Sequence, residues 1–378
     1  MRLIIAGDFC PQNRVADIFD KGDYHRVLGE VKDIFGDADY SIVNLECPVT
    51  NGKEKPISKY GENLSCSING IEALKWLNIN CVTLANNHFF DYGKDGVTNT
   101  LVSLSEFGIE SVGGGKDIFE AAKILYKQIG DVTLAVINCC EHEFSIATEE
   151  LAGSNPLNPI QQYYSIREAR NHADFVIVIV HGGNEYYQLP SPRMKEAYRF
   201  FVDSGADVVI NHHQHCYSGY EKYNGAFIFY GIGNFCFDDP LFNDPNWNQG
   251  YMIRMKLEKG NPVSCELIPY IQCHEKPIIR KMNDGERKKF DQELLSINKT
   301  ISDDKSLCHL YEKYLENSAE SVKELFLPIV NRISVALLRR RLLPFFIPEG
   351  KKNRVLDYIV CESHLPKVIY YLKNKKNE

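Results

Sequence analysis

Long hydrophobic runs are missing from this sequence of 378 residues. No window reaches the roughly 18 uninterrupted apolar residues of a membrane-spanning helix, so we expect none. Residues 1–8 form a short apolar run that leads into a turn, without the charged segment, longer apolar stretch and cleavage site of a secretory signal. Internal repeats and low-complexity tracts are missing too, apart from a Lys-rich and Asn-rich tail. These absences favour a cytoplasmic globular protein.

The cysteines lack the spacing of a structural zinc site. Twelve are present, but no two of them form a CxxC pair. A secreted disulfide framework belongs to small, loop-rich folds, whereas a chain of this length with 44% hydrophobic residues can build a core without disulfides. We therefore expect buried thiols in a reducing compartment.

The formal net charge of −7 is unevenly distributed. Carboxylates outnumber basic side chains in residues 1–272, whereas Lys and Arg outnumber Asp and Glu in residues 273–378. An acidic main body argues against nucleic acid as a partner. The two parts are expected to meet different partners.

Short apolar runs alternate with helical patterns over most of the chain. This alternation predicts an α/β fold, and the nearly continuous Val, Ile and Leu runs favour strands that are buried on both faces. Expected strands are residues 3–6, 40–45, 82–85, 133–138, 175–180, 208–210 and 226–230, and a hairpin of 251–257 with 263–269. Expected helices are residues 24–35, 68–77, 96–107, 166–172 and 193–204.

The pattern of charged and apolar residues changes near residue 273. Residues 276–293 and 306–327 are charged and helical in period, and residues 330–343 are apolar and include three consecutive arginines. We predict a main domain over 1–272 and a helical extension over 273–378. The apolar segment 326–347 is a candidate for contact with an anionic membrane surface, and the alternative is a helix packed on the main domain.

Polar side chains of metal-binding type follow the predicted strands. The carboxyl ends of parallel strands meet at one edge of a sheet, where α/β folds bind ligands and metals. Carboxylate, Asn and imidazole ligands suit Mn, Fe or Zn better than Mg or Ca. A set large enough for two ions indicates a dinuclear hydrolytic centre. The candidates are Asp8, Glu46, Asn87, His88, His181, Glu185, His213, His215 and Asn234.

The order of these motifs resembles the CapA capsule-synthesis family, also called the poly-γ-glutamate synthesis family. That family looks like a branch of the calcineurin-type metallophosphoesterases. The resemblance spans roughly residues 2–270. Its pieces are Gly7-Asp8, Asn44-Leu45-Glu46-Cys47-Pro48, Leu84-Ala85-Asn86-Asn87-His88 with Asp91-Tyr92-Gly93, Gly113-Gly114-Gly115, His181-Gly182-Gly183-Asn184-Glu185-Tyr186, His212-His213-Gln214-His215 and Tyr230-Gly231-Ile232-Gly233-Asn234-Phe235.

The resemblance implies a four-layer α/β/β/α metallophosphatase-like sandwich, followed here by the helical extension. It implies that Asp8 and His215 hold one divalent ion and that Glu46 bridges to a second. The second ion would be held by Asn87, His181 and His213. His88 would donate a hydrogen bond or a proton to the substrate, and Glu185 would bind a cation or orient His181. Asn234 would line the pocket.

The sequence departs from the phosphoesterase pattern at the first motif, where Asp8 is followed by Phe9 and Cys10 in place of Asp-x-His. Cys10 is either a soft ligand or a residue packed beside the strand, so the first metal site is expected to be weak. Two functions remain open. One is a metal-dependent hydrolase of a phosphoester or γ-glutamyl amide in capsule or extracellular-polymer synthesis, with an anionic polymer or phosphoester as substrate. The alternative is a non-catalytic polymer-binding or assembly factor that contacts a synthase through its extension.

Overall fold

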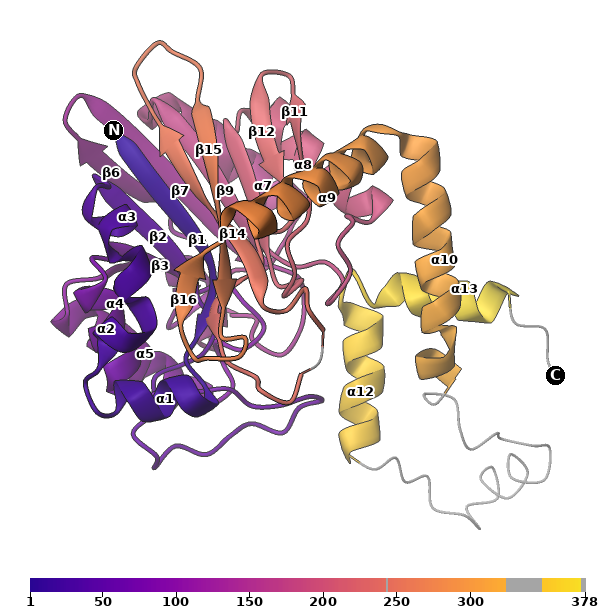
Figure 1. Cartoon of the computed structure of the whole chain (residues 1–378). Coiled ribbons are helices and arrows are strands. Elements are labelled where there is room, and N and C mark those ends of the chain that lie inside the picture. Colours follow the sequence, from indigo (N-terminus) through magenta and orange to yellow (C-terminus); the bar gives the residue numbers. More distant parts are fainter. Residues whose placement is uncertain (243, 324–348, 375–378) are drawn as a thin grey trace.

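Two β-sheets packed face to face form the centre of the molecule (Figure 1). The computed structural model describes residues 1–242, 244–323 and 349–374. The first sheet has the strand order β16-β15-β14-β1-β2-β3-β4, with β13 also paired to β1. Its strands are β1 Arg2–Cys10, β2 Tyr40–Leu45, β3 Cys81–Thr83, β4 Glu110–Val112, β13 Asn234–Phe237, β14 Gln249–Lys256, β15 Ser264–Gln272 and β16 Ile279–Lys281.

The second sheet has the order β11-β12-β10-β9-β7-β6. Its strands are β6 Leu125–Ile129, β7 Val132–Cys140, β9 Phe175–His181, β10 Val208–His212, β11 Tyr220–Tyr223 and β12 Ala226–Phe229, and a separate short pair joins β5 Gly114–Gly115 to β8 Gly153–Ser154. In both sheets the inner strands run parallel, and β2, β9 and β10 are buried along their whole length. Each expected strand from residue 3 to residue 230 is confirmed to within a few residues, and so is the hairpin, formed by β14 and β15.

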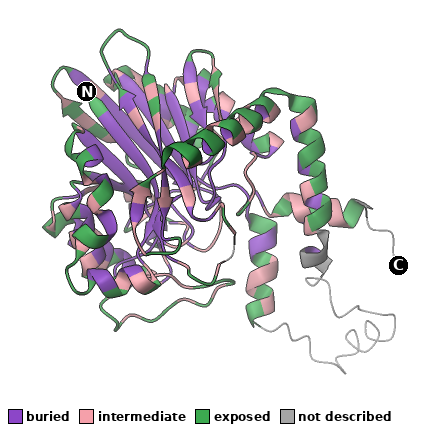
Figure 2. Cartoon of the chain, viewed as in Figure 1, coloured by how far each residue is buried: buried purple, intermediate pink, exposed green. Residues whose placement is uncertain are grey.

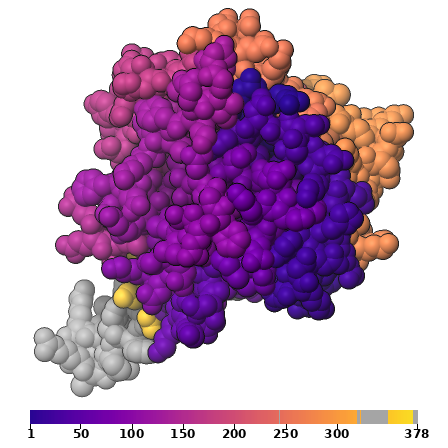
Figure 3. Space-filling view, turned by 90° about the vertical axis from the view of Figure 1, so that its left-hand side faces the viewer, coloured from indigo at the N-terminus to yellow at the C-terminus, as the bar shows by residue number. Residues whose placement is uncertain are grey.

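Helices cover the outer face of each sheet. On the first sheet lie α1 Asn13–Phe19, α2 Tyr24–Leu28, α3 Lys32–Gly36, α4 Ile68–Trp76 and α5 Gly93–Glu106. On the second lie α7 Pro159–His172 and α8 Pro192–Ser204, while the short α6 Ile118–Ala121 contacts β5 and β8. The N-terminal part of the chain forms most of the face seen in Figure 3. The expected four-layer α/β/β/α arrangement is thus confirmed.

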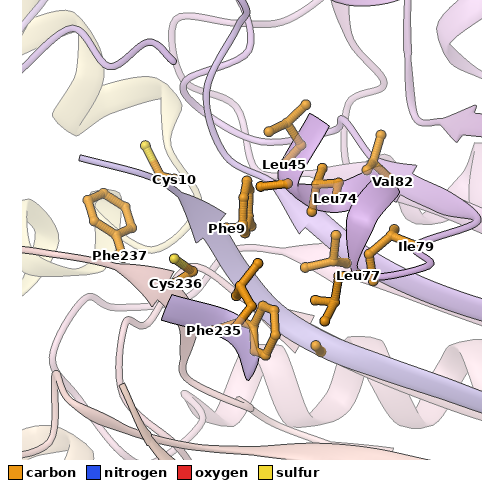
Figure 4. Packing of buried hydrophobic residues seen from close by; sticks show 14 of the residues in the cluster. Phe9, Cys10, Leu45, Leu74, Leu77, Ile79, Val82, Phe235, Cys236 and Phe237 are labelled. Carbon is orange, nitrogen blue, oxygen red and sulfur yellow. The ribbon is translucent and has the colours of Figure 1, made fainter. Parts of the chain in front are cut away.

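Three apolar layers hold the four layers together. Ile5, Ile42, Ile177 and Ile210 belong to the layer between the sheets. The layer under α1–α5 is shown in Figure 4, where Phe9 and Leu45 of the sheet lie near Leu74 of α4. The sheets are buried almost throughout, as Figure 2 shows. Burial of apolar surface at about 25 cal/mol per Å² makes these layers the main source of stability.

One predicted helix is broken. The helix expected over residues 24–35 is divided into α2, a 3₁₀ turn over Gly29–Val31 and α3. Leu28 and Val31 have φ near −110° and ψ near 0°, outside the α-helical minimum. Gly29, a poor helix former, lies where the first segment ends.

The C-terminal part begins differently from the prediction. The helix expected from residue 276 is wrong in its first part, because Ile279–Lys281 form β16 and extend the first sheet. The helix α9 Asp284–Ser302 starts only after Asn283, which forms a capping box with Glu286. It is followed by α10 Asp304–Lys323, α12 Glu349–Val360 and α13 Leu365–Asn374, and α10 packs against α9 and α13 (Figure 1).

The apolar segment 326–347, the helix expected over 330–343 and the end of the helix expected over 306–327 lie outside the described residues. Among the helices that are described, none combines the length and the apolar character needed to cross a membrane. All twelve cysteines are free, and all except Cys265 and Cys308 are buried, as expected.

Candidate metal centre

The carboxyl ends of strands from both sheets meet at one site. Asp8 lies near the end of β1, Glu46 directly follows β2, and His181 ends β9. His212, at the end of β10, pairs in register with His181, so the loop that carries His213 and His215 starts beside it. The topology therefore brings together the polar residues that follow separate strands in the sequence.

Two groups of side chains have the geometry of metal-binding sites. Glu46, His181 and His213 form one group, and Asp8, Glu46 and His215 form the other. Within each group the potential ligand atoms lie within 4.8 Å of one another, and all the residues are buried. Glu46 belongs to both groups, which is the position of a carboxylate that bridges two ions.

The group of Glu46, His181 and His213 is completed by Asn87. Nε2 of His181 lies 3.0 Å from Oδ1 of Asn87, 3.1 Å from Nδ1 of His213 and 3.4 Å from Oε1 of Glu46. On its other side, Nδ1 of His181 lies 3.3 Å from the Asn44 amide nitrogen. Four groups that can each donate an electron pair to a cation thus surround one point.

Asp8 and His215 are each held by a neighbour. Oδ1 of Asp8 accepts a hydrogen bond of 2.8 Å from Asn44 and lies 3.1 Å from Nδ1 of His212. Nδ1 of His215 lies 2.8 Å from Oδ1 of Asn234, which leaves its Nε2 facing Oε1 of Glu46 at 3.7 Å. Asn234 therefore orients His215, a role typical of residues behind metal ligands.

Glu46 is the least satisfied group of the site. It is fully buried, and neither of its carboxylate oxygens has a hydrogen-bond partner within the described chain. Burial and the nearby charge of Asp8 raise the pKa of Glu46 well above its usual range. A buried carboxylate without donors is costly in any fold, and a bound cation would remove that cost. The donor set thus fits a divalent ion.

The histidines are in the form that binds metals. Burial, followed by the charge of His212, lowers the pKa of His181 well below its usual range, and burial with the charge of His181 does the same for His213. Both imidazoles are neutral near pH 7, the state in which a ring nitrogen donates to a metal. Asp8 also has a lowered pKa: burial raises it, but His212 and His215 outweigh that effect.

The loop after β10 has a strained backbone. His213 and His215 have φ of 87° and 55°, a region that side chains other than glycine seldom adopt. Such strain concentrates at functional sites, where the surrounding structure enforces it. This strain could not be predicted from the residues alone, because the spacing His-x-His is equally compatible with an extended loop.

His88 lies beside the two groups and belongs to neither. Its Nδ1 lies 2.7 Å from Oδ2 of Asp91 and 3.1 Å from Nζ of Lys59. Burial and the charge of Lys59 lower its pKa. Lys59 was missed in the sequence because it stands in a loop far from any strand end.

Glu185 and Cys10 differ in their relation to the centre. Glu185 lines a cavity of about 480 Å³ together with His88 and His215. Burial raises the pKa of Glu185, but its electrostatic interactions with His213 and His215 outweigh burial, so the pKa is lowered below its usual value. Cys10 is in neither described metal group, and its sulfur accepts a hydrogen bond of 3.3 Å from Gln12. Of the two possibilities for Cys10, packing beside the strand fits this contact.

Four further residues near the centre had no predicted role: His212, Glu143, Asp357 and His364. Glu143 accepts a hydrogen bond of 3.3 Å from the Asn87 amide, and burial raises its pKa to about 8. Asp357 and His364 come from the C-terminal helices and line the cavity. Their sequence surroundings are those of ordinary helical residues, so only the fold places them here.

Comparison with known proteins finds one matching family model and several relatives. The model of the family described as bacterial capsule synthesis protein PGA_cap matches residues 2–239. The chain is 31% identical to the capsule biosynthesis protein CapA of Bacillus anthracis over 63% of its length and 60% of the relative's. It is 30% identical to the PGA biosynthesis protein CapA of Bacillus subtilis over 71% of its length and 70% of the relative's. A phosphatase structure from Mycoplasma pneumoniae aligns at a TM-score of 0.46 and 16% identity, over 78% of this chain and 98% of that one.

Proposed function

The chain belongs to the bacterial capsule synthesis family PGA_cap, and on that premise we propose that it is a metal-dependent hydrolase acting in capsule or extracellular-polymer synthesis. The bond it cleaves is a phosphoester or a γ-glutamyl amide. The observation that carries the proposal is the position of Glu46, which is shared by two potential ligand groups and has both oxygens unpaired in the described structure. A purely structural carboxylate would be expected to have donors.

Each ligand has a proposed place. Asp8 and His215 would hold one ion, Glu46 would be shared with the second, and His181 and His213 would hold the second together with the Asn87 amide oxygen. Two divalent ions bound there would supply an activated water and stabilise the leaving oxygen. The mixed oxygen and nitrogen donors favour Mn, Fe or Zn. The first position has fewer protein ligands, so we expect it to bind more weakly.

Two residues act on the substrate beside the ions. Nζ of Lys59, 3.1 Å from Nδ1 of His88, can donate to that nitrogen, so the proton of the neutral imidazole lies on Nε2, which can donate a hydrogen bond or that proton to the leaving group. Glu185, which lines the cavity, binds a cation there or orients His181. Both residues line the cavity.

Metal analysis combined with hydrolysis assays tests the proposal. The purified protein is expected to contain Mn, Fe or Zn and to hydrolyse bis-p-nitrophenyl phosphate or γ-glutamyl-p-nitroanilide. His213→Ala should lose metal and activity, whereas His309→Ala, on the exposed surface of α10, should retain both. A wild-type protein with neither metal nor His213-dependent activity would rule out the hydrolase.

A second function, a non-catalytic assembly factor, is favoured by one feature of the extension. Leu356, Ile359 and Leu372 on α12 and α13 are more than half exposed, as expected for a surface that meets another protein. In this case polymer synthesis in cells would survive the double change Asp8→Ala with His213→Ala. It would be lost on changing the three exposed side chains to Ser. The hydrolase predicts the opposite pattern for the double variant.

A further inference from the structure

The turn between α12 and α13 is attached directly beside the metal centre. Glu141, which follows β7, accepts hydrogen bonds from Ser363 Oγ at 2.9 Å and from Cys361 Sγ at 3.7 Å. Glu362 accepts from the His142 backbone amide at 2.9 Å, and its Oε1 lies 2.7 Å from His142 Nδ1. The partners on the main body lie at the end of β7, next to the end of β9. The turn is therefore fixed to the same sheet edge that carries the ligands.

Neighbouring helices support this attachment. The Asn353 amide of α12 donates to the Ser58 carbonyl at 3.0 Å. Tyr314 of α10 donates to Oδ1 of Asn184 at 3.2 Å and stacks on Tyr187 with 4.2 Å between ring centroids. Val322, Tyr358 and Val368, from three helices, form a small apolar cluster of their own. The segment is thus held both to the body and within the extension.

The attachment makes the C-terminal segment one wall of the cavity. Asp357, Tyr358, His364 and Lys367 line it together with His88, Glu185 and His215 of the main body. These four residues lie beyond residue 239, where the match to the family ends. The cavity of this chain therefore contains groups that the family pattern does not supply.

His364 is the best oriented group of that wall. Its Nδ1 lies 3.0 Å from Oδ2 of Asp357, and its ring stacks on Tyr358 at 5.2 Å. Its Nδ1 is buried with only this ion-pair contact to Asp357, whereas no hydrogen bond of its Nε2 to another described residue is found, and the ring lines the cavity. Burial lowers the pKa of His364, but Asp357 and Glu143 outweigh this effect and raise it. An oriented ring with an unused donor beside a metal centre is suited to hold an oxyanion.

Positive and negative side chains share the cavity around His364: Lys59 and Lys367 line it together with Glu62, Glu143, Glu185, Asp239 and Asp357. Asp357 is compensated by the imidazole itself. Lys367 adds a positive charge on the same wall.

We propose that His364, oriented by Asp357, contacts an anionic group of the substrate, a phosphate or a carboxylate, so that the C-terminal segment completes the substrate site. This role rests on the proposed hydrolase function, because the substrate is the one held at the metal centre. His364 is a binding residue in this role, and Asp357 is a positioning residue.

The test compares His364→Gln and His364→Lys in the full chain with His309→Gln as the matched surface control. The probe is inorganic phosphate, measured by calorimetry and as an inhibitor. His364→Gln should weaken phosphate binding about tenfold and raise KM similarly, with kcat within about twofold and metal content unchanged. His364→Lys should restore most of the binding, which a merely structural histidine would not allow.

Two outcomes overturn the inference: equal phosphate binding by wild type and His364→Gln, or no binding by either. The calorimetric measurement needs no turnover, so the inference can fail while hydrolysis persists, and hydrolysis can fail while the inference stands. If His364→Gln is unstable by thermal melting, the His364→Lys variant decides alone. Phosphate binding and a KM near the wild-type values in His364→Lys then support the proposal, and a tenfold loss of phosphate binding in His364→Lys contradicts it.

Discussion

Oε1 of Glu46 lies 3.4 Å from Nε2 of His181. Glu46 follows β2 of the first sheet, and His181 ends β9 of the second sheet. The two sheets are otherwise joined by the apolar layer between them. A cation held by both residues would therefore join the two sheets at one edge, and binding should be coupled to the stability of the whole sandwich.

Removal of metal should lower the melting temperature. With a chelator, the wild-type protein is expected to melt about 3 °C lower, because a ligand at a hundred times its Kd adds about 2.7 kcal/mol. Glu46→Gln should contain less than half of the wild-type metal and show little further change with chelator. Equal chelator effects on both proteins, by differential scanning calorimetry, would contradict the bridging role.

His88 should affect turnover without affecting metal. His88→Asn is expected to lower kcat by about 10²–10³-fold, the usual loss on removing a general acid. Metal content should be unchanged because His88 is outside both ligand groups. The comparison is with His309→Asn on α10, in steady-state kinetics with a nitrophenyl phosphoester. A loss of metal with the activity would show that His88 is a ligand instead.

Gly7 permits the close approach of β1 and β13. A Cβ added at Gly7 would lie 1.8 Å from the carbonyl oxygen of Gly233. Gly7→Ala should therefore reduce the free energy of unfolding by about 3 kcal/mol, since backbone must move next to Asp8. Gly36→Ala is the control, because its Cβ would meet no atom within 4 Å. Urea denaturation measures both, and similar values for the two variants would refute the argument.

Docking of the C-terminal turn should weaken as the pH rises. The hydrogen bond to Glu362 raises the pKa of His142 above its usual value. A histidine whose pKa is raised in the folded state stabilises that state. This stabilisation is complete at pH values below the unfolded-state pKa of about 6.5, and it is lost as the pH rises through the folded-state pKa. Hydrogen exchange of residues 361–367, corrected for intrinsic rates, should therefore show less protection at pH 8.5 than at pH 6.

The control for this pH effect is His142→Gln. It removes one of the two histidines near the turn whose pKa is raised, so protection should be lower at pH 6 and should change less between the two pH values than in the wild type, the remaining change coming from His364. If the wild-type protein is equally protected at both, the charged pair does not contribute to docking. The same measurement on α7 should show no pH effect, because none of its bonds involves this pair.

The layered fold was predictable because its signal is local. Buried parallel strands appear as continuous apolar runs, as in β9, and the amphipathic helix α8 follows a Pro and a capping Ser191. The prediction that failed, a helix beginning at residue 276, also rested on a local pattern. Residues 279–281 fit a helical periodicity, but they pair with β15, and a hydrogen-bonded contact between distant segments leaves no periodic pattern in the sequence.

The sequence by itself determined which residue types follow the strands, and with them the candidates Asp8, Glu46, His181 and His213. It could do so because the ends of parallel strands meet at a common edge. Only the tertiary structure decided that Glu46 is shared by two ligand groups and lacks hydrogen-bond donors in the described chain. The same holds for His364, which reaches the cavity through contacts with residues more than 200 positions away in the chain. Such contacts depend on packing between distant segments, and no short sequence pattern records that packing.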